Sequence, residues 1–182
     1  MNICVYGAAS SLIENKYIES VEKLGREIGK RGHALVFGAG GSGLMGAAAK
    51  GVKETGGYIT GVIPSFFIEE SLEPIYDKCD EIIYTETMHE RKQTMEDMAD
   101  AFIVVPGGIG TYEEFFETIV LKQLGRHRKP IALYNVDGYF DHLEALLHEA
   151  ERRKFIRSKC DRLYRGFSDL EEMFSYLEND GG

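Results

Sequence analysis

The sequence predicts an α/β protein with a doubly wound parallel sheet and helices on both faces. Short runs of apolar and β-branched residues alternate along the chain with longer stretches of helical spacing. Several of the short runs are apolar almost throughout, which is typical of strands covered on both faces. Strand–helix alternation at this spacing indicates βαβ units, and no linker or repeat divides the chain, so one domain over residues 1–182 is expected.

The expected elements follow one another in chain order. Helical spacing of apolar residues marks Ile18–Ile28, Phe115–Leu124 and Tyr139–Leu147, and Leu170–Leu177 is expected to be a closing helix. The segment Ser65–Asp80 is either a loop or short helix that covers a site, or an ordinary connection with a solvated acidic face. The six expected strands are Ile3–Tyr6, Ala34–Phe37, Tyr58–Ile63, Ile82–Thr85, Ala101–Val105 and Ile131–Tyr134.

Composition and charge argue against several classes of protein. The chain has 21 Lys and Arg residues against 30 Asp and Glu residues, a formal charge of −9, which argues against nucleic-acid binding but leaves room for a small anion held by backbone N–H groups. No signal peptide is recognisable, and no apolar run approaches the length of a membrane span. Cys4, Cys79 and Cys160 are far apart and are expected to be reduced thiols in a cytoplasmic protein. The histidines show no ligand spacing, so no metal is expected.

Three of the predicted strands end in loops of small residues. The loops are Gly7–Ser11, Gly38–Gly43 and Pro106–Thr111. In open α/β sheets, ligands bind beyond the carboxyl ends of the strands, near the point where the strand order reverses. All three loops should fall along that edge, so the sequence predicts a ligand site where they meet.

The loop after the second strand reads GAGGSGLMG from Gly38 to Gly46. Its glycines permit close approach of a ligand, and the helix expected from about Leu44 would point free N–H groups toward a phosphate or sugar. A tight turn with close helix packing is the alternative. The dinucleotide fingerprint normally follows the first strand, and no Lys-Ser or Lys-Thr pair follows this loop. A nicotinamide dehydrogenase and a Walker A site are therefore disfavoured.

The loop after the fifth strand, PGGIGTYEE from Pro106, is the sharpest motif. Its glycines can expose consecutive N–H groups, and Thr111 is expected to cap the next helix and to donate its hydroxyl to a phosphate. Glu113 and Glu114 are expected in the first helical turn, where acids also suit the helix macrodipole. Because two carboxylates beside a phosphate cradle would repel the ligand, we expect one of them to face the sugar carbon while the loop holds the phosphate.

The segment Met88–Met95 begins a helix that leads into the fifth strand and its loop. Arg91 and Lys92 should therefore lie beside that loop, although a solvated helix face is the alternative. Arg91 offers a planar fork for a carboxylate or phosphate, and Lys92 offers a point charge. Met88 is expected to line an apolar part of the pocket, whereas core packing is favoured for Met95.

The motif MHERKQTM together with PGGIGTYEE resembles the Lonely Guy (LOG) family, the cytokinin-activating phosphoribohydrolases, whose members are often named lysine decarboxylases. The resemblance spans most of the chain through GAGGSGLMG, GVIP at Gly61–Pro64, QLGRHRKPI from Gln123 and NVDGYFDHL from Asn135. The decarboxylase name has no support in the sequence, because no pyridoxal-phosphate lysine motif is recognisable.

The resemblance implies a Rossmann-like fold, no cofactor, and a homodimer or a larger assembly of dimers. It implies hydrolysis of the N-glycosidic bond of N6-modified adenosine 5′-monophosphates, or of AMP, to the free base and ribose 5-phosphate. Arg91 and Glu114 match the family's catalytic residues. Glu114 is expected to act as nucleophile, base or electrostatic stabiliser. The residues expected to bind the substrate are Met88, Lys92, Gly107, Gly108, Ile109, Gly110, Thr111, Tyr112 and Glu113.

Two other functions stay open at this point. One is a nucleotide-binding or sensing module without catalysis, and the other is a general AMP nucleosidase in purine salvage. The pairing of Arg91 with Glu114 favours an enzyme, because a pure binder has little use for a carboxylate beside a phosphate. Base preference is not fixed by the sequence.

A basic stretch near the C-terminus stands out in this acidic chain. It holds seven basic residues in fourteen positions: Arg152, Arg153, Lys154, Arg157, Lys159, Arg162 and Arg165. It could form a partner or nucleic-acid surface. A solvated face, or salt bridges across a dimer, is favoured because isolated surface charges contribute little.

Overall fold

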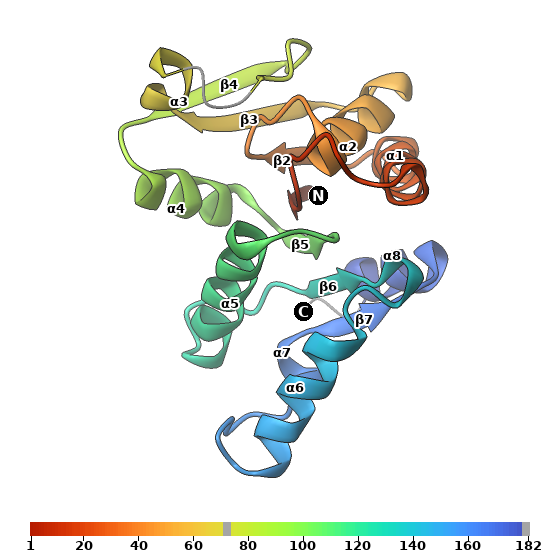
Figure 1. Cartoon of the computed structure of the whole chain (residues 1–182), viewed down its shortest axis with the longest axis vertical. Coiled ribbons are helices and arrows are strands. Elements are labelled where there is room, and N and C mark those ends of the chain that lie inside the picture. Colours follow the sequence, from red (N-terminus) through yellow and green to blue (C-terminus); the bar gives the residue numbers. More distant parts are fainter. Residues whose placement is uncertain (71–73, 180–182) are drawn as a thin grey trace.

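The computed structural model describes residues 1–70 and 74–179, which form a seven-stranded sheet in which every pairing is parallel (Figure 1). The strand order is β4-β3-β2-β1-β5-β6-β7. The chain winds outward from β1 to β4, returns to place β5 beside β1, and then winds the other way. This arrangement confirms the predicted doubly wound α/β fold. The strands are β1 (Asn2–Tyr6), β2 (Ala34–Phe37), β3 (Ile59–Pro64), β4 (Glu81–Thr85), β5 (Ala101–Val104), β6 (Ile131–Tyr134) and β7 (Arg165–Phe167).

Helices cover both faces of the sheet. Buried side chains of α1, α2 and α8 pack with one face, and those of α4, α5, α6 and α7 pack with the other. Alternate residues of β1 pack into the two cores: Ile3 and Val5 into one, Cys4 and Tyr6 into the other. Because both faces of the strand are covered, every residue of this run is apolar or aromatic. The helices are α1 (Asn15–Lys30), α2 (Gly43–Glu54), α3 (Ser65–Glu69), α4 (Met88–Met98), α5 (Ile109–Gln123), α6 (Asp141–Arg152), α7 (Cys160–Leu163) and α8 (Leu170–Asn179), with a 3-10 turn η1 at Val136–Gly138.

Glycines bring α1 and α2 into close contact. A Cβ at Gly25 of α1 would overlap the carbonyl oxygen of Ala48, and a Cβ at Gly51 of α2 would overlap that of Glu22. The two helices therefore pack backbone to backbone.

The structure departs from the expected elements mainly at the C-terminal edge. The strand β7 was not predicted, because its three residues pair only with β6 and are too short for a hydrophobic pattern. The helix α3 confirms that a short helix begins Ser65–Asp80, although residues 71–73 of that segment lie outside the described residues. Over residues 1–70 and 74–179, no helix is both long and apolar enough to span a bilayer.

Candidate active site

The three small-residue loops meet at the carboxyl edge of the sheet, as predicted. The loop after β1 joins the other two: Ala8 N–H donates to the Pro106 carbonyl oxygen at 3.2 Å, and Leu44 N–H donates to the Ala8 carbonyl oxygen at 2.8 Å. A pocket of about 340 Å³ opens there, with walls from these loops and from α3, α4 and α5. It lies at the topological switch between β1 and β5, where open α/β sheets bind their ligands.

Helix α5 begins at the pocket. Its N-cap residue is Gly108, and Tyr112 N–H makes the first bond of the helix, to the Gly108 carbonyl oxygen at 3.0 Å. The N–H groups of Ile109, Gly110 and Thr111 precede that bond and are available to an anion. A Cβ at Gly108 or Gly110 would meet open space, so a ligand can approach the backbone closely.

Two expectations about the start of α5 were wrong. Thr111 does not cap the helix, because the extended backbone of Gly108 ends the loop and α5 begins at Ile109. Thr111 is instead a buried residue of the first turn that still lines the pocket. Glu113 and Glu114 consequently lie in the second turn, about one turn away from the free N–H groups. This separation reduces their repulsion of an anion bound at the helix start.

Arg91 is held by backbone carbonyl groups rather than by an acid. Its Nε donates to the Val62 carbonyl oxygen at 3.1 Å and its Nη2 to that of Gly38 at 2.8 Å. Its Nη1 lies 3.7 Å from Met88 Sδ, and its Cζ lies 5.4 Å from the centre of the Phe67 ring. The side chain is 9% exposed, and no carboxylate of the described residues forms an ion pair with it. Arg91 therefore presents to the pocket a positive charge that no ion pair compensates within the described residues, and the Glu114 carboxyl in the same pocket experiences this charge.

Glu114 lines the same pocket from α5. Burial raises the pKa of Glu114 to about 7, while the positive charge of Arg91 acts in the opposite direction. The neighbouring charge of Glu113 raises the pKa further. A carboxyl group that titrates near neutral pH can hold or release a proton under working conditions, which suits acid–base chemistry.

Lys92 points away from the pocket. Its Nζ forms ion pairs with Glu113 and with Glu117, the latter at 2.6 Å. Nearby, burial raises the pKa of Glu96 to about 7, with a further contribution from the charge of Glu117. This cluster ties α4 to α5 behind the site. Lys92 itself does not line the pocket, but its ion-pair partner Glu113 does.

The loop after β2 has a packing role at the start of α2. The N–H groups of Leu44 and Met45 both donate to the Ala8 carbonyl oxygen, at 2.8 and 3.3 Å. Gly43 has φ 57°, and a Cβ there would lie 2.6 Å from the Ser10 carbonyl oxygen, so only glycine fits. The expectation that α2 offers free N–H groups to a phosphate was wrong, because the loop after β1 occupies them. Close helix packing, the alternative interpretation, describes this turn.

The structure brings most of the predicted site residues to the pocket. Four do not line it: Lys92, Gly107, Ile109 and Tyr112. Gly107 borders a neighbouring pocket of about 320 Å³, and its carbonyl oxygen accepts from the Tyr139 hydroxyl at 2.6 Å. The predicted residues that do line the pocket are Met88, Arg91, Gly108, Gly110, Thr111, Glu113 and Glu114.

Sequence reasoning missed several lining residues. Phe67 lines the pocket from α3, so the start of the segment Ser65–Asp80 borders the candidate site. Met95 lines the pocket as well as the core, although only core packing was favoured for it. Tyr6 and Met45 were not predicted. The position of Tyr6 as the last strand residue before the switch-point loop is the signal that would have found it.

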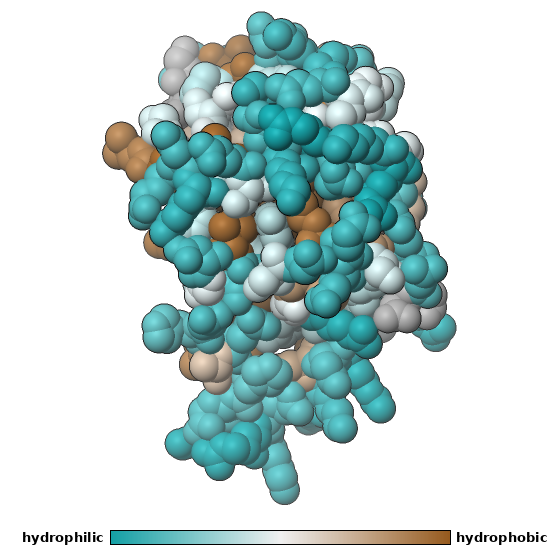
Figure 2. Space-filling model, turned by 90° about the vertical axis from the view of Figure 1, so that its right-hand side faces the viewer, coloured by the Kyte–Doolittle hydropathy of each residue, from teal (hydrophilic) through white to brown (hydrophobic). Residues whose placement is uncertain are grey.

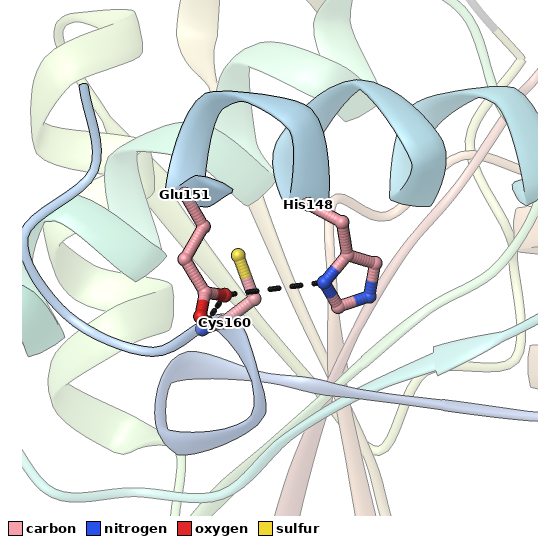
Figure 3. A group of neighbouring side chains, drawn as sticks. All are labelled: His148, Glu151 and Cys160. Carbon is pink, nitrogen blue, oxygen red and sulfur yellow. Dashed lines mark hydrogen bonds and ion pairs between the residues drawn. The ribbon is translucent and has the colours of Figure 1, made fainter. Parts of the chain in front are cut away.

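A separate group of metal-ligand side chains lies on α6 and α7, away from the pocket (Figure 3). In the described residues, His148, Glu151 and Cys160 place one donor atom each within 4.8 Å of the others. Glu151 already accepts a hydrogen bond from the Cys160 N–H at 2.8 Å, and burial raises the pKa of the Cys160 thiol to about 12. The hydrogen bond from Cys160 N–H to Glu151 joins α7 to α6.

The fold and the pocket define an α/β protein with a candidate ligand pocket at the switch point of a parallel sheet. The family model described as "Possible lysine decarboxylase" matches residues 45–177, and the chain belongs to that family, the LOG family of its curated relatives. The chain is 38% identical to the probable cytokinin riboside 5′-monophosphate phosphoribohydrolase LOGL9 of Oryza sativa subsp. japonica, over 97% of this chain and 77% of that protein. It is 35% identical to the cytokinin riboside 5′-monophosphate phosphoribohydrolase LOG2 of Arabidopsis thaliana, over 97% of this chain and 82% of that protein.

Solved structures show the same fold at lower identity. A molybdenum cofactor carrier protein from Chlamydomonas reinhardtii superposes with a TM-score of 0.72 at 23% identity, covering 97% of this chain and 94% of that chain. The X-ray structure of the protein TM1055 superposes with a TM-score of 0.71 at 20% identity, covering 97% and 98%. At this identity the likeness concerns the fold alone.

Proposed function

We propose that this chain hydrolyses the N-glycosidic bond of adenosine 5′-monophosphates, with or without an N6 substituent, to the free base and ribose 5-phosphate. The observation that carries the proposal is a pocket shared by the start of α5, the uncompensated Arg91 and a Glu114 that titrates near pH 7. The names of the relatives at 35–38% identity support the same reaction. The proposal covers two kinds of substrate: AMP, as in purine salvage, and N6-modified adenosine 5′-monophosphates.

The phosphate is placed at the start of α5. The N–H groups of Ile109, Gly110 and Thr111 would donate to its oxygens, and the helix dipole would favour its negative charge. Binding of this remote group positions the sugar for reaction. Glu114 lies about one turn further along the same helix, so its carboxylate would face the sugar ring of a nucleotide held there.

The reaction breaks the bond between the anomeric carbon and the base nitrogen. Positive charge develops on the sugar, and the Glu114 carboxylate is placed to stabilise that charge, to attack the carbon or to activate water. The oxygen of water ends on the anomeric carbon, and the base nitrogen leaves with its electron pair and takes up a proton. Arg91, fixed by two carbonyl groups, holds Glu114 partly ionised and contributes positive charge for the phosphate or the departing base.

Among the described residues, the pocket lacks the lysine that a pyridoxal-phosphate-dependent amino-acid decarboxylase needs. Within the described residues, no lysine lines it. Lys92, the lysine nearest in sequence to Arg91, is paired with Glu113 and Glu117. A Schiff-base lysine for pyridoxal phosphate is therefore missing from this site.

We also propose that the chain acts as a cytoplasmic homodimer, as the resemblance implies. An exposed apolar stripe supports the dimer: Phe116 and Val120 of α5 and its C-cap residue Leu124 recur every four residues and are 37%, 50% and 65% exposed. The free thiols Cys4, Cys79 and Cys160 fit a reducing compartment. Light scattering after size exclusion tests the dimer, and Val120→Lys should convert it to monomers.

Product analysis tests the proposed reaction. The purified protein is incubated separately with AMP, N6-isopentenyladenosine 5′-monophosphate and adenosine, and free base and ribose 5-phosphate are quantified. Release from one or both monophosphates, with little from adenosine, is the expected result, and the ratio reports base preference. Tight AMP binding without any product would overturn the proposal in favour of a nucleotide sensor. Equal release from adenosine would refute the phosphate-binding role of α5.

A further inference from the structure

A second pocket, of about 480 Å³, lies at the opposite end of α5 and is lined by basic side chains. Lys122 and Arg128 reach it from the end of α5 and the segment that follows. Arg157, Lys159 and Arg162 reach it from the basic stretch after α6. Among the described residues, no Asp or Glu lines it. The chain has a net charge of −9, but five cationic side chains around one hollow make the electrostatic potential there positive.

Within the described residues, some members of the basic stretch form ion pairs with acidic residues, and the members that line the pocket do not. Arg152 and Arg153 pair with Glu149 of their own helix at 2.7 and 2.6 Å, as the favoured interpretation of a solvated, ion-paired face predicts. The five cationic residues of the pocket form no ion pair within residues 1–70 and 74–179. The helix macrodipole accounts for Lys122 in the last turn of α5, but not for side chains delivered by a different segment.

The surroundings of two lining residues, Lys122 and His127, disfavour the positively charged form of each. The pKa of Lys122 is lowered by burial and by the charge of Arg165, and that of His127 by burial and by the charges of Lys122 and Lys129. Lys122 is partly buried, the other four cationic side chains are exposed, and like charges gathered around one hollow repel one another. A bound anion would relieve that repulsion, so the pocket has an electrostatic driving force for anion binding.

The lining also indicates the chemical class of the anion. Three arginines supply planar forks, and two lysines supply point charges, the usual partners of phosphate oxygens. A single phosphate group carries too little charge to match five cations, whereas linked phosphates carry three or more. In the part of the chain that the structure describes, Leu163 is the one large apolar residue of the lining and no aromatic ring of Phe, Tyr or Trp lines it, so no stacking platform for nucleic-acid bases is formed there. The lower end of the molecule, formed by the end of α6 and the segment after it, is mostly hydrophilic (Figures 1 and 2).

We propose that this pocket binds a chain of linked phosphate groups, as in pyrophosphate, tripolyphosphate or the phosphate tail of a nucleoside triphosphate. The shared chemistry is two or more adjacent phosphates with their negative oxygens spread along the hollow. Its volume of about 480 Å³ lies in the range of small-molecule sites. The site is distinct from the catalytic pocket, which lies at the other end of α5 and presents a single cation, Arg91.

Isothermal titration with pyrophosphate and with tripolyphosphate tests this proposal without measuring hydrolysis, so it can fail independently of the proposed function. Wild type is compared with Arg157→Gln/Arg162→Gln and with the charge-matched control Arg152→Gln/Arg153→Gln, and thermal melts verify that all three are folded. Binding should weaken at least about tenfold in the first variant, because hydrogen bonds to charged groups are lost. It should change less than about twofold in the control and weaken with added salt.

Three results would overturn the proposal. They are no pyrophosphate binding to wild type, equal losses in the two charge-matched variants, and orthophosphate binding as tightly as tripolyphosphate. Titration with ATP separates the two sources of the phosphate chain: affinity equal to that of tripolyphosphate shows that the tail alone is recognised. A single-stranded RNA that binds this pocket more tightly than tripolyphosphate would replace the proposal with a nucleic-acid surface.

Discussion

Arg91 and Gly38 interlock across 53 residues of sequence: the guanidinium donates from Nη2 to the Gly38 carbonyl oxygen at 2.8 Å and occupies the space that a side chain at Gly38 would need. The end of β2 and the first turns of α4 are joined by this contact. The second bond, from Nε to the Val62 carbonyl oxygen, fixes the plane of the guanidinium. The positive charge is thereby aimed at the pocket without an acidic partner.

Gly38→Ala should disable Arg91 while leaving the arginine in the chain. The new Cβ would overlap Nη2 and displace the guanidinium. Because misplacement of a positioning group by about 1 Å costs roughly 10²-fold, kcat/KM for AMP should fall by about that factor. Steady-state kinetics measure the loss, and Arg91→Ala gives the reference for complete removal. Unchanged kcat/KM in Gly38→Ala would show that the position of Arg91 does not matter.

Gly110→Ala should weaken phosphate binding without destabilising the folded protein. The position lies in the first turn of α5 with open space for a Cβ, so alanine should stabilise the helix by about 1 kcal/mol and raise Tm by roughly 2–4 °C. The same methyl group would intrude on a phosphate seated over the helix start, so KM for AMP should rise. Inhibition by adenosine, which lacks the phosphate, is the control and should change little. A higher Tm with an unchanged KM would place the phosphate elsewhere.

Stability should depend on pH through Glu114. Its folded pKa of about 7 lies above the ordinary value of 4.5, so the associated stability is present below about pH 4.5 and is lost as pH rises through 7. Glu114→Gln removes this loss and should gain at most about 3 kcal/mol at pH 8. At pH 4, below both pKa values, the group is protonated in the folded and in the unfolded protein, so the gain should nearly vanish. Thermal melts at the two pH values measure the effect, and an equal gain at both would contradict it.

Catalysis should show the opposite dependence on pH. If the ionised carboxylate is the working form, kcat at saturating AMP should rise with pH and reach half its plateau at or above about pH 7, since a bound phosphate raises the Glu114 pKa further. Saturation removes the separate effect of substrate ionisation on binding. A pH–rate profile from 5.5 to 9 measures this. A flat profile, or a rate that falls through pH 7, would assign a different role to Glu114.

The fold was predictable because its determinants are local. Runs of apolar and β-branched residues marked six strands within one or two residues, and helical spacing marked α1, α5, α6 and α8. The strand β7 was not predicted, because an edge strand of three residues is specified by its pairing with β6 and not by its own hydrophobic pattern. Glycine motifs at three strand ends also located the pocket, since parallel strands place their carboxyl ends along one edge.

The details of the site depend on contacts between distant segments, which no local pattern contains. The N–H groups at the start of α2 were expected to be free, but the Ala8 carbonyl oxygen takes two of them. Lys92 was expected in the pocket, but the geometry of α4 against α5 brings it to Glu113 and Glu117. The basic pocket likewise forms only because the end of α5 lies beside Arg157 and Arg162.

The most direct test of the central claim is the turnover of Glu114→Gln measured beside its binding of AMP. Glu117→Gln is the matched control, because Glu117 lies one turn further along α5, pairs with Lys92 and does not line the pocket. We predict that Glu114→Gln binds AMP within a few-fold of wild type but hydrolyses it at least about 10³-fold more slowly, while Glu117→Gln stays within about fivefold. Retained hydrolysis in a folded Glu114→Gln protein would contradict the assignment of Glu114 as the catalytic carboxylate.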